Sequence, residues 1–122
     1  GVERADSGQP SLMITGRAQE LADDVMQRAY ARLVSATERY QLSRQAWVSW
    51  TSTGEASLTR QTAQLKRLWE AGELSTTDYL VQLTATLDVQ QNALELRETL
   101  WRAWFEWLSA SGQVDAWLGT NR

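Results

Sequence analysis

The chain has 122 residues, enough for one domain or one long supersecondary unit, and its 12 basic and 15 acidic side chains give a net charge of -3. It has no cysteine and no histidine, which excludes disulfides, thiol chemistry and the usual zinc ligands, and removes the commonest general base. No block of basic residues offers a nucleic-acid footprint, and no run approaches the roughly 20 apolar residues that cross a bilayer.

Residues 1–16 are predicted to be a flexible lead-in. The segment contains Gly1, Gly8, Pro10 and Gly16 among polar residues, a composition typical of loops. It lacks a basic n-region, and its apolar run is only "LMI", so it does not have the pattern of a signal peptide.

A helix is predicted over residues 17–50, where apolar residues recur at steps of three and four. The main stripe, with Ser43 as its polar interruption, consists of Met26, Ala29, Leu33, Ala36, Tyr40, Trp47 and Trp50. A second stripe consists of Ala22, Val25, Tyr30, Val34 and Val48. This helix is therefore apolar on more than one side.

The next stretch, "TSTGEASL", predicts a break or kink over residues 51–55. Two β-branched threonines and Gly54 weaken a helix here, the glycine alone by about 1 kcal/mol. Ser52 and Glu55 have the spacing of a capping box that would restart the helix. The apolar pattern then predicts a second helical segment over 56–71.

A tight turn is predicted at residues 72–75, within "WEAGELSTTDYL". Gly72 follows the last periodic residues, where helices commonly end in a left-handed glycine. Ser75 stands at an N-cap position, where its hydroxyl would accept from the Asp78 N–H while the Asp78 carboxylate bonds back. So short a link folds the following helix back antiparallel on the preceding one.

The last helix is predicted over residues 76–111. Its heptad leucine stripe consists of Leu80, Leu87, Leu94, Trp101 and Leu108. A second apolar face consists of Ala93, Leu96, Leu100, Ala103 and Trp107. Gly112 is expected to end the helix, leaving residues 113–122 as a short turn and tail. With no strand candidate, the predicted fold class is all-α, a long antiparallel helical hairpin or coiled coil.

Five of the seven tryptophans are expected to gather in one zone far from the turn: Trp47, Trp50, Trp101, Trp104 and Trp107. They fit a core cluster, a lateral interface between subunits, or an anchor at a membrane surface. Since each long helix carries two apolar faces, the surplus face requires a third segment, a second copy of the chain or another protein.

No catalytic constellation is present, and the chain is not expected to be an enzyme. The one lysine, Lys66, lies among polar helical residues with no motif around it. Asp23 and Asp24 are adjacent, so they diverge on a helix and favour a solvated face over a metal pair. Phosphate-binding glycine loops are missing, and no cofactor or metal is expected.

The segment "LWEAGELSTTDYL", continued by "LTATLDVQQNALELRETLWRAWFEWLSASG", resembles the C-terminal helical hairpin of TolC-like outer-membrane efflux proteins. "ELADDVMQRAYARLVSATERYQLSRQAW" similarly resembles the preceding helix of that family, so the likeness covers about residues 18–119. The positions that match the family pattern are Trp69, Gly72, Ser75, Asp78, Leu80 and Gly112.

The resemblance implies the periplasmic portion of an outer-membrane protein that forms a trimeric export duct. It would place Gly72, Glu73, Leu74 and Ser75 at a tip that docks a periplasmic adaptor, itself joined to an inner-membrane pump, and Asp78 near the aperture. Helices with two apolar faces would then have neighbours on both sides within the wall of a tube.

The chain also departs from the family pattern. Trp69 replaces the more usual tyrosine, and Val81 stands where some members carry a second acidic residue, which puts a strong acidic gate in doubt. Barrel strands and the first helical repeat are missing, so this chain alone neither crosses a membrane nor forms the duct. It is either a fragment of such a channel or a free-standing relative. The alternative function is a helical-bundle interaction module that self-associates through the tryptophan zone.

Overall fold

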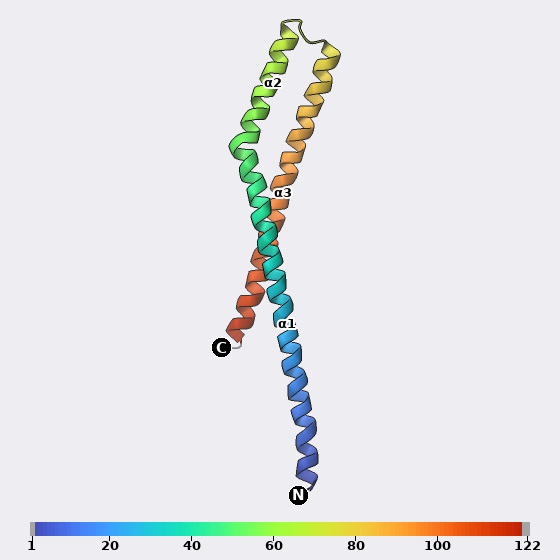
Figure 1. The fold of residues 1–122 in the computed structure, drawn as a ribbon, viewed down its shortest axis with the longest axis vertical. Helices are drawn as coiled ribbons and strands as arrows, with labels where there is room; N and C mark the ends of the chain where they lie inside the picture. Colours follow the sequence, from blue (N-terminus) through green and yellow to red (C-terminus); the bar gives the residue numbers. More distant parts are fainter. Residues whose placement is uncertain (1, 121–122) are drawn as a thin grey trace. The chain divides into compact units, whose positions relative to one another are not determined.

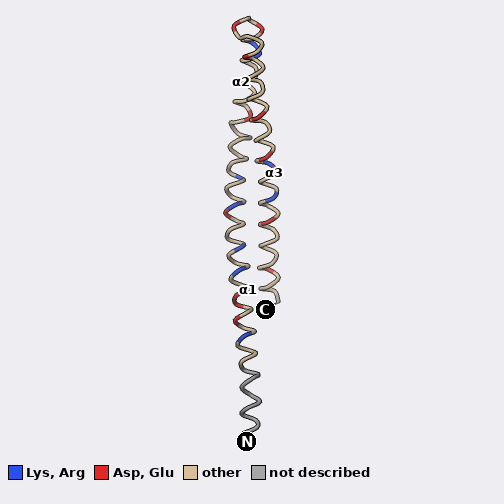
Figure 2. Tube along the Cα trace, turned by 90° about the vertical axis from the view of Figure 1, so that its right-hand side faces the viewer, with Lys and Arg blue, Asp and Glu red and all other residues tan. Residues whose placement is uncertain are grey.

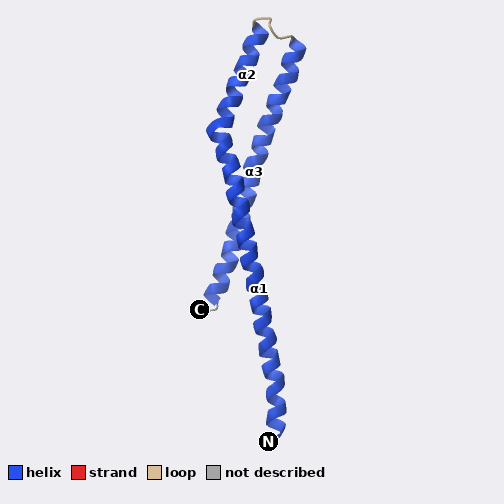
Figure 3. Ribbon diagram, viewed as in Figure 1, coloured by secondary structure: helices blue, strands red, loops and turns tan. Residues whose placement is uncertain are grey.

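The structure, a computed structural model, describes the backbone of residues 2–120 and the side chains of residues 13–119. It contains α1 (Val2–Ser49), the π-helix η1 (Trp50–Gly54), α2 (Glu55–Glu70) and α3 (Thr76–Thr120) (Figure 1). Apart from the loop between α2 and α3, residues 2–120 are helical throughout and include no strand (Figure 3). The predicted all-α fold is confirmed.

The chain divides into two compact units, each described separately here. One consists of Glu38–Phe105, and the other of Gly1–Thr37 together with Glu106–Arg122. Helices α1 and α3 contribute to both units, whereas η1, α2 and the loop belong to Glu38–Phe105 alone.

Glu38–Phe105 is a helical hairpin in which α2 and the first part of α3 run side by side below the connecting loop (Figure 1). Its most buried side chains come from both arms: Leu58, Thr86, Ala93 and Ala103. Alanine at two of these four positions lets the helix backbones approach closely, so the core between the arms is thin.

The second unit pairs the N-terminal part of α1 with the C-terminal end of α3. Ala36 and Ala110 are almost completely buried, at 1% and 0% exposure. Val114, one helical turn after Ala110 on α3, is also buried. The Arg32 guanidinium donates a hydrogen bond of 3.0 Å to the side-chain carbonyl of Gln113. Small residues again form the contact, with a polar pair at its edge.

The main stripe predicted on α1 faces inward, as expected. Every member from Met26 to Trp50, including the polar Ser43, is buried or half-buried. The second stripe is exposed: Val25, Tyr30, Val34 and Val48 all expose between 44% and 57% of their surface. The surplus apolar face predicted for this helix is therefore left uncovered.

On α3 the structure buries one of the two predicted apolar faces and leaves the other exposed. The face of Ala93, Leu96, Leu100, Ala103 and Trp107 is the buried or half-buried one. The heptad leucine stripe is exposed at each of its positions. The alanine face is the one that turns inward because small side chains allow a closer approach of the helices, and close approach buries more surface along the contact.

The lead-in predicted for residues 1–16 is wrong over the described part, because α1 already begins at Val2. Gly8 and Gly16 each cost a helix about 1 kcal/mol relative to alanine, and Pro10 costs about 3 kcal/mol because it lacks the backbone donor and its ring crowds the preceding turn. The helix nevertheless continues through all three residues, since each other residue added to a formed helix gains a hydrogen bond.

The predicted end of the last helix at Gly112 is also wrong, because α3 continues to Thr120. Gly112 is exposed, and a Cβ added there would meet nothing within 4 Å. The segment predicted as turn and tail is therefore helical through Thr120, and it supplies Val114 to the core of its unit. A glycine alone does not end a helix whose next turn buries an apolar side chain.

The irregularity predicted at residues 51–55 is present, but the helix is not broken there. Residues 50–54 form a π-helical turn, in which the Glu55 N–H donates to the Trp50 carbonyl. Gly54 keeps helical angles of φ -64° and ψ -44°. The Ser52–Glu55 capping box is not formed; the Ser52 hydroxyl instead donates to the Ser49 carbonyl at 3.4 Å.

The π-helical turn follows from how closely Trp50 lies against Gly54. A Cβ added to Gly54 would lie only 2.6 Å from Cε3 of the Trp50 ring. The hydroxyls of Thr51 and Thr53 donate to the carbonyls of Trp47 and Ser49, at 3.1 and 2.9 Å. Hydroxyls that bond back in this way bend helices, and rare π-helical segments occur mostly as single turns of this kind inside α-helices.

Candidate functional site

The loop between α2 and α3 ends α2 in a Schellman motif. Gly72 has φ +74°, the left-handed conformation predicted for it. The Glu73 N–H donates to the Leu68 carbonyl at 2.9 Å, and the Gly72 N–H donates to the Trp69 carbonyl at 3.1 Å. These are the two bonds that define the motif, and they satisfy carbonyls that the end of a helix leaves unpaired.

Helix α3 begins with the predicted cap. The Asp78 N–H donates to the Ser75 hydroxyl at 3.1 Å, which confirms Ser75 as N-cap. The return bond from the Ser75 N–H to the Asp78 carboxylate is not formed among the described residues. Asp78 remains in the first turn of α3, where a negative charge suits the helix dipole.

Replacing Ser75 by alanine is expected to lower the free energy of unfolding by about 1 kcal/mol, because the Asp78 N–H loses its acceptor. Urea denaturation followed by circular dichroism measures the change. Replacing Ser75 by aspartate, which keeps an acceptor at the cap, is the matched control and should cost far less. Equal losses in both variants would contradict the capping role.

Two aromatic rings join the arms on either side of the turn. The Trp69 and Tyr79 rings are stacked, with centroids 4.8 Å apart and planes 7° from parallel. The indole N–H of Trp69 also donates to the Thr76 hydroxyl at 3.1 Å. We call these three side chains the aromatic clasp. It links the last turn of α2 to the first turn of α3 directly across the loop.

The predicted tip residues lie together in this loop, but they differ in exposure. Glu73 and Ser75 are exposed, whereas Leu74 is half-buried. The reason is that the Leu74 N–H donates to the Leu68 carbonyl at 3.2 Å, which turns the chain back over the end of α2. The trace at this end of the hairpin carries acidic positions, with basic positions close to them (Figure 2).

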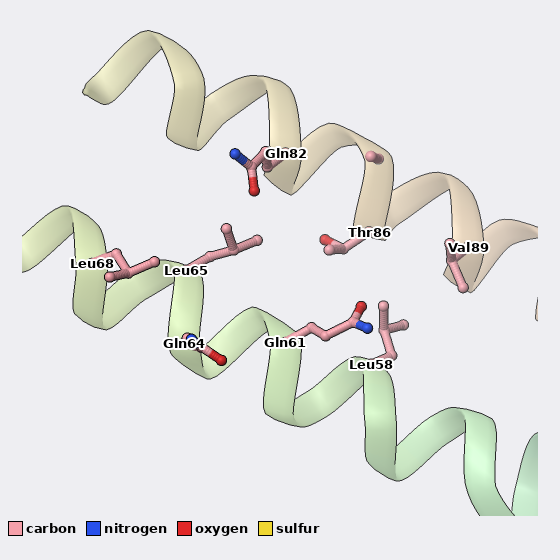
Figure 4. A pocket seen from close by; sticks show the side chains of 9 residues that line it. Leu58, Gln61, Gln64, Leu65, Leu68, Gln82, Thr86 and Val89 are labelled. Atoms are coloured by element: carbon pink, nitrogen blue, oxygen red, sulfur yellow. The ribbon is translucent and has the colours of Figure 1, made fainter. Parts of the chain in front are cut away.

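Below the loop, the two arms line an open hollow of about 430 Å³ (Figure 4). Leu65 of α2 and Gln82 of α3 point toward one another across it, and Thr86 points from α3 toward α2. The hollow is lined by Leu58, Gln61, Gln64, Leu65, Leu68, Gln82, Ala85, Thr86 and Val89. Glutamines replace the large apolar residues that would otherwise fill this part of the contact, so the hairpin is loosely packed here.

Four of the five tryptophans predicted to gather in one zone line two hollows of the unit Glu38–Phe105. Trp47 and Trp50 are half-buried and line one hollow, together with residues 90, 93 and 94. Trp101 and Trp104 line another with Tyr40 and Arg44, their rings meeting edge to face at 5.7 Å. Trp107 is half-buried and belongs to the other compact unit.

The charged side chains of the hairpin make exposed pairs along single helices. The Lys66 Nζ lies 3.9 Å from Oε1 of Glu70, and the Arg102 Nη2 lies 3.7 Å from Oε2 of Glu98. Such exposed pairs contribute little to stability. Among residues 13–119, no group of three or more His, Cys, Asp or Glu side chains is arranged to hold a metal ion. None of the described helices is long and apolar enough to cross a membrane.

The aromatic clasp is the feature of this region that the sequence pattern did not reveal. The available signal was an aromatic residue at the end of one predicted helix and another in the first turn of the next. Aromatic side chains at such positions are within reach once the turn closes, but the sequence gives no indication of their ring orientation. The threonine acceptor is likewise indistinguishable from an ordinary first-turn residue.

No family model, no curated protein and no solved structure matches the chain.

Proposed function

We propose that this chain is the periplasmic helical part of a TolC-like outer-membrane efflux channel, and that the 72–75 turn docks a periplasmic adaptor. The observation that supports this proposal is the turn itself. Gly72 is left-handed and Ser75 caps α3, at the positions where the resemblance requires them. Both ends of the loop are fixed, so the loop presents one defined surface to a partner.

The exposed apolar stripes support the assembly that goes with this function. In a tube built of hairpins, each helix has neighbours on both sides, so apolar residues are needed beyond those that hold the hairpin together. The stripes on α1 and α3 supply such surfaces. We propose a homo-oligomer, a trimer in the full-length channel, joined through the adaptor to an inner-membrane pump that drives transport without catalysis by this chain.

Asp78 is the candidate for the aperture. It is exposed in the first turn of α3, next to the tip. Val81 is also exposed and occupies the place of a second acidic residue. The proposed aperture therefore carries one carboxylate per hairpin in the first turn of α3, and its attraction for cations is weaker than that of a paired acidic gate.

Replacing Leu74 by aspartate in the full-length channel is expected to abolish adaptor docking while the hairpin stays folded. Docking is measured in the source cell by placing a photo-crosslinking benzoylphenylalanine at Glu73 and identifying the captured protein by mass spectrometry. The expected product is a periplasmic adaptor that itself carries a helical hairpin.

Two further variants keep this test decisive. Thr84→Asp adds the same charge on α3, at an exposed position away from the tip and the aperture, and should leave crosslinking unchanged. Glu73→Lys, with the crosslinker moved to the exposed Ala71, tests the tip without touching the half-buried Leu74 or the Ser75 cap. Unchanged adaptor crosslinking and unchanged export in both Leu74→Asp and Glu73→Lys would refute the docking role.

The alternative function is a free-standing helical-bundle module that self-associates through its tryptophans. Trp101 and Phe105 favour it, because they are 58% and 67% exposed on α3 and together offer a large aromatic surface. The gene distinguishes the two functions. A reading frame that continues upstream with a related helical repeat and alternating apolar strands supports the channel, whereas a short frame with its own leader supports the module.

A further inference from the structure

We infer that the aromatic clasp, Trp69 with Thr76 and Tyr79, sets the docking conformation of the 71–75 loop and thereby determines how tightly a partner binds there. The inference rests on the proposed function, since docking at this loop is what the clasp would serve. It assigns positioning roles to three residues on the flanks of the loop.

The loop backbone does not determine its own conformation, and the clasp is placed where it can do so. Gly72 adopts left-handed and right-handed conformations with similar ease, so its backbone does not by itself select φ +74°. The Schellman bonds are made at the surface, where water competes for the same carbonyls. The clasp is the one side-chain link among the described residues that joins the last turn of α2 to the first turn of α3 across the loop.

The hydrogen bond between the Trp69 indole N–H and the Thr76 hydroxyl is not needed to satisfy either group. Trp69 is 38% exposed, so its N–H has access to water and does not need a protein partner. Thr76 is also exposed, and the cap of α3 is supplied by Ser75, so the Thr76 hydroxyl is not required for capping. The bond between them instead fixes the indole against rotation about the stack with Tyr79, and so fixes the spacing of the two arms.

A loop held in one conformation binds more tightly than a mobile one, because less freedom is lost when the partner arrives. The clasp leaves Glu73 and the loop backbone open to a partner while it occupies the sides of the hairpin. Loss of the clasp should therefore weaken docking without removing any atom that contacts the partner.

The test compares Thr76→Val with Thr84→Val, a matched control. Thr84 is also an exposed threonine of α3, but its hydroxyl donates only to the Leu80 carbonyl of its own helix, at 2.8 Å. Trp69→Phe, which keeps a ring for the stack but lacks the N–H, provides the second arm. Amide hydrogen exchange at Gly72, Glu73 and Leu74 of the 122-residue chain reports loop opening, and urea denaturation reports global stability.

Thr76→Val and Trp69→Phe are each expected to speed loop exchange about 5-fold, the usual effect of one lost hydrogen bond, while Thr84→Val changes it less than about 2-fold. The double variant should be no faster than Trp69→Phe alone, because both changes remove the same bond. In the full-length channel, crosslinking from Glu73 to the adaptor should fall by a similar factor.

Loop exchange that Thr76→Val and Trp69→Phe leave unchanged would overturn the inference, whatever the adaptor does. Faster exchange with undiminished crosslinking would overturn it as well. In that second case Leu74→Asp and Glu73→Lys decide whether the proposed function stands. If these two variants still weaken crosslinking, the loop docks the adaptor without help from the clasp. If they do not, the proposed function fails too.

Discussion

Replacing Leu87 and Leu94 together by glutamate is expected to convert the 122-residue chain from an oligomer into a monomer without loss of helix. Both side chains are exposed, at 56% and 50%, and they stand seven residues apart on the heptad stripe of α3. Burying a leucine completely contributes about 1.5 to 3 kcal/mol, and only about half of each side chain remains to be buried, so the loss of two from an interface weakens association at least about 10-fold. The two introduced carboxylates of one chain would also lie near those of the associated copy, and their like charges repel each other.

Sedimentation equilibrium over the widest accessible concentration range measures this change. Asn92→Glu with Thr99→Glu is the matched control, since these residues are also exposed, lie on α3 and stand seven positions apart, but lie off the leucine stripe. The control should associate as the unmodified chain does. An unmodified chain that stays monomeric at every concentration would contradict the prediction and would leave the exposed stripes for a different partner.

The turn and the inward face of α1 could be predicted from the sequence because local chemistry determines them. A left-handed glycine and a serine cap stabilise the turn whatever lies further away, and the structure has both. The stripe that runs from Met26 to Trp50 is buried or half-buried as predicted. The second stripe on the same helix differs from it in having no leucine and a single aromatic residue, Tyr30.

On α3, by contrast, periodicity could not choose between two faces. The leucine stripe and the alanine face repeat with nearly the same period, and larger side chains made the leucines the more obvious contact. The structure buries Ala93 and Ala103 and exposes Leu87 and Leu94. Which face turns inward depends on how closely the two helices can approach, and this property belongs to the pair of helices, so the sequence of one helix does not contain it.

The π-helical turn and the aromatic clasp were beyond prediction for a related reason. Each depends on where one ring lies: Trp50 against Gly54, and Trp69 against Tyr79. Weak helix formers showed that residues 51–55 would be irregular, but whether the irregularity is a break or a wide turn depends on that packing. For candidate binding surfaces the limit is similar, since Leu74 lies in the predicted tip but is half-buried.

Gly54 and Gly112 are both helical glycines, and replacing each by alanine is expected to have opposite effects. A methyl group at Gly54 would lie 2.6 Å from the Trp50 ring, so either the ring or the backbone must move. We expect the free energy of unfolding to fall by about 1 to 3 kcal/mol, as for other overpacked sites. At Gly112 the added methyl group meets nothing within 4 Å, and helix propensity should raise stability by up to about 1 kcal/mol.

Urea denaturation measures both effects, in the Leu87→Glu, Leu94→Glu background, so that self-association does not contribute to the apparent stability. The comparison isolates the ring contact, because each substitution adds one methyl group to a helical glycine. Gly54→Ala together with Trp50→Ala removes the ring and should recover the helix-propensity gain relative to Trp50→Ala alone. If Gly54→Ala stabilises the chain as much as Gly112→Ala, the Trp50 ring does not maintain the π-helical turn, and the bulge must arise from the hydroxyls of Thr51 and Thr53 instead.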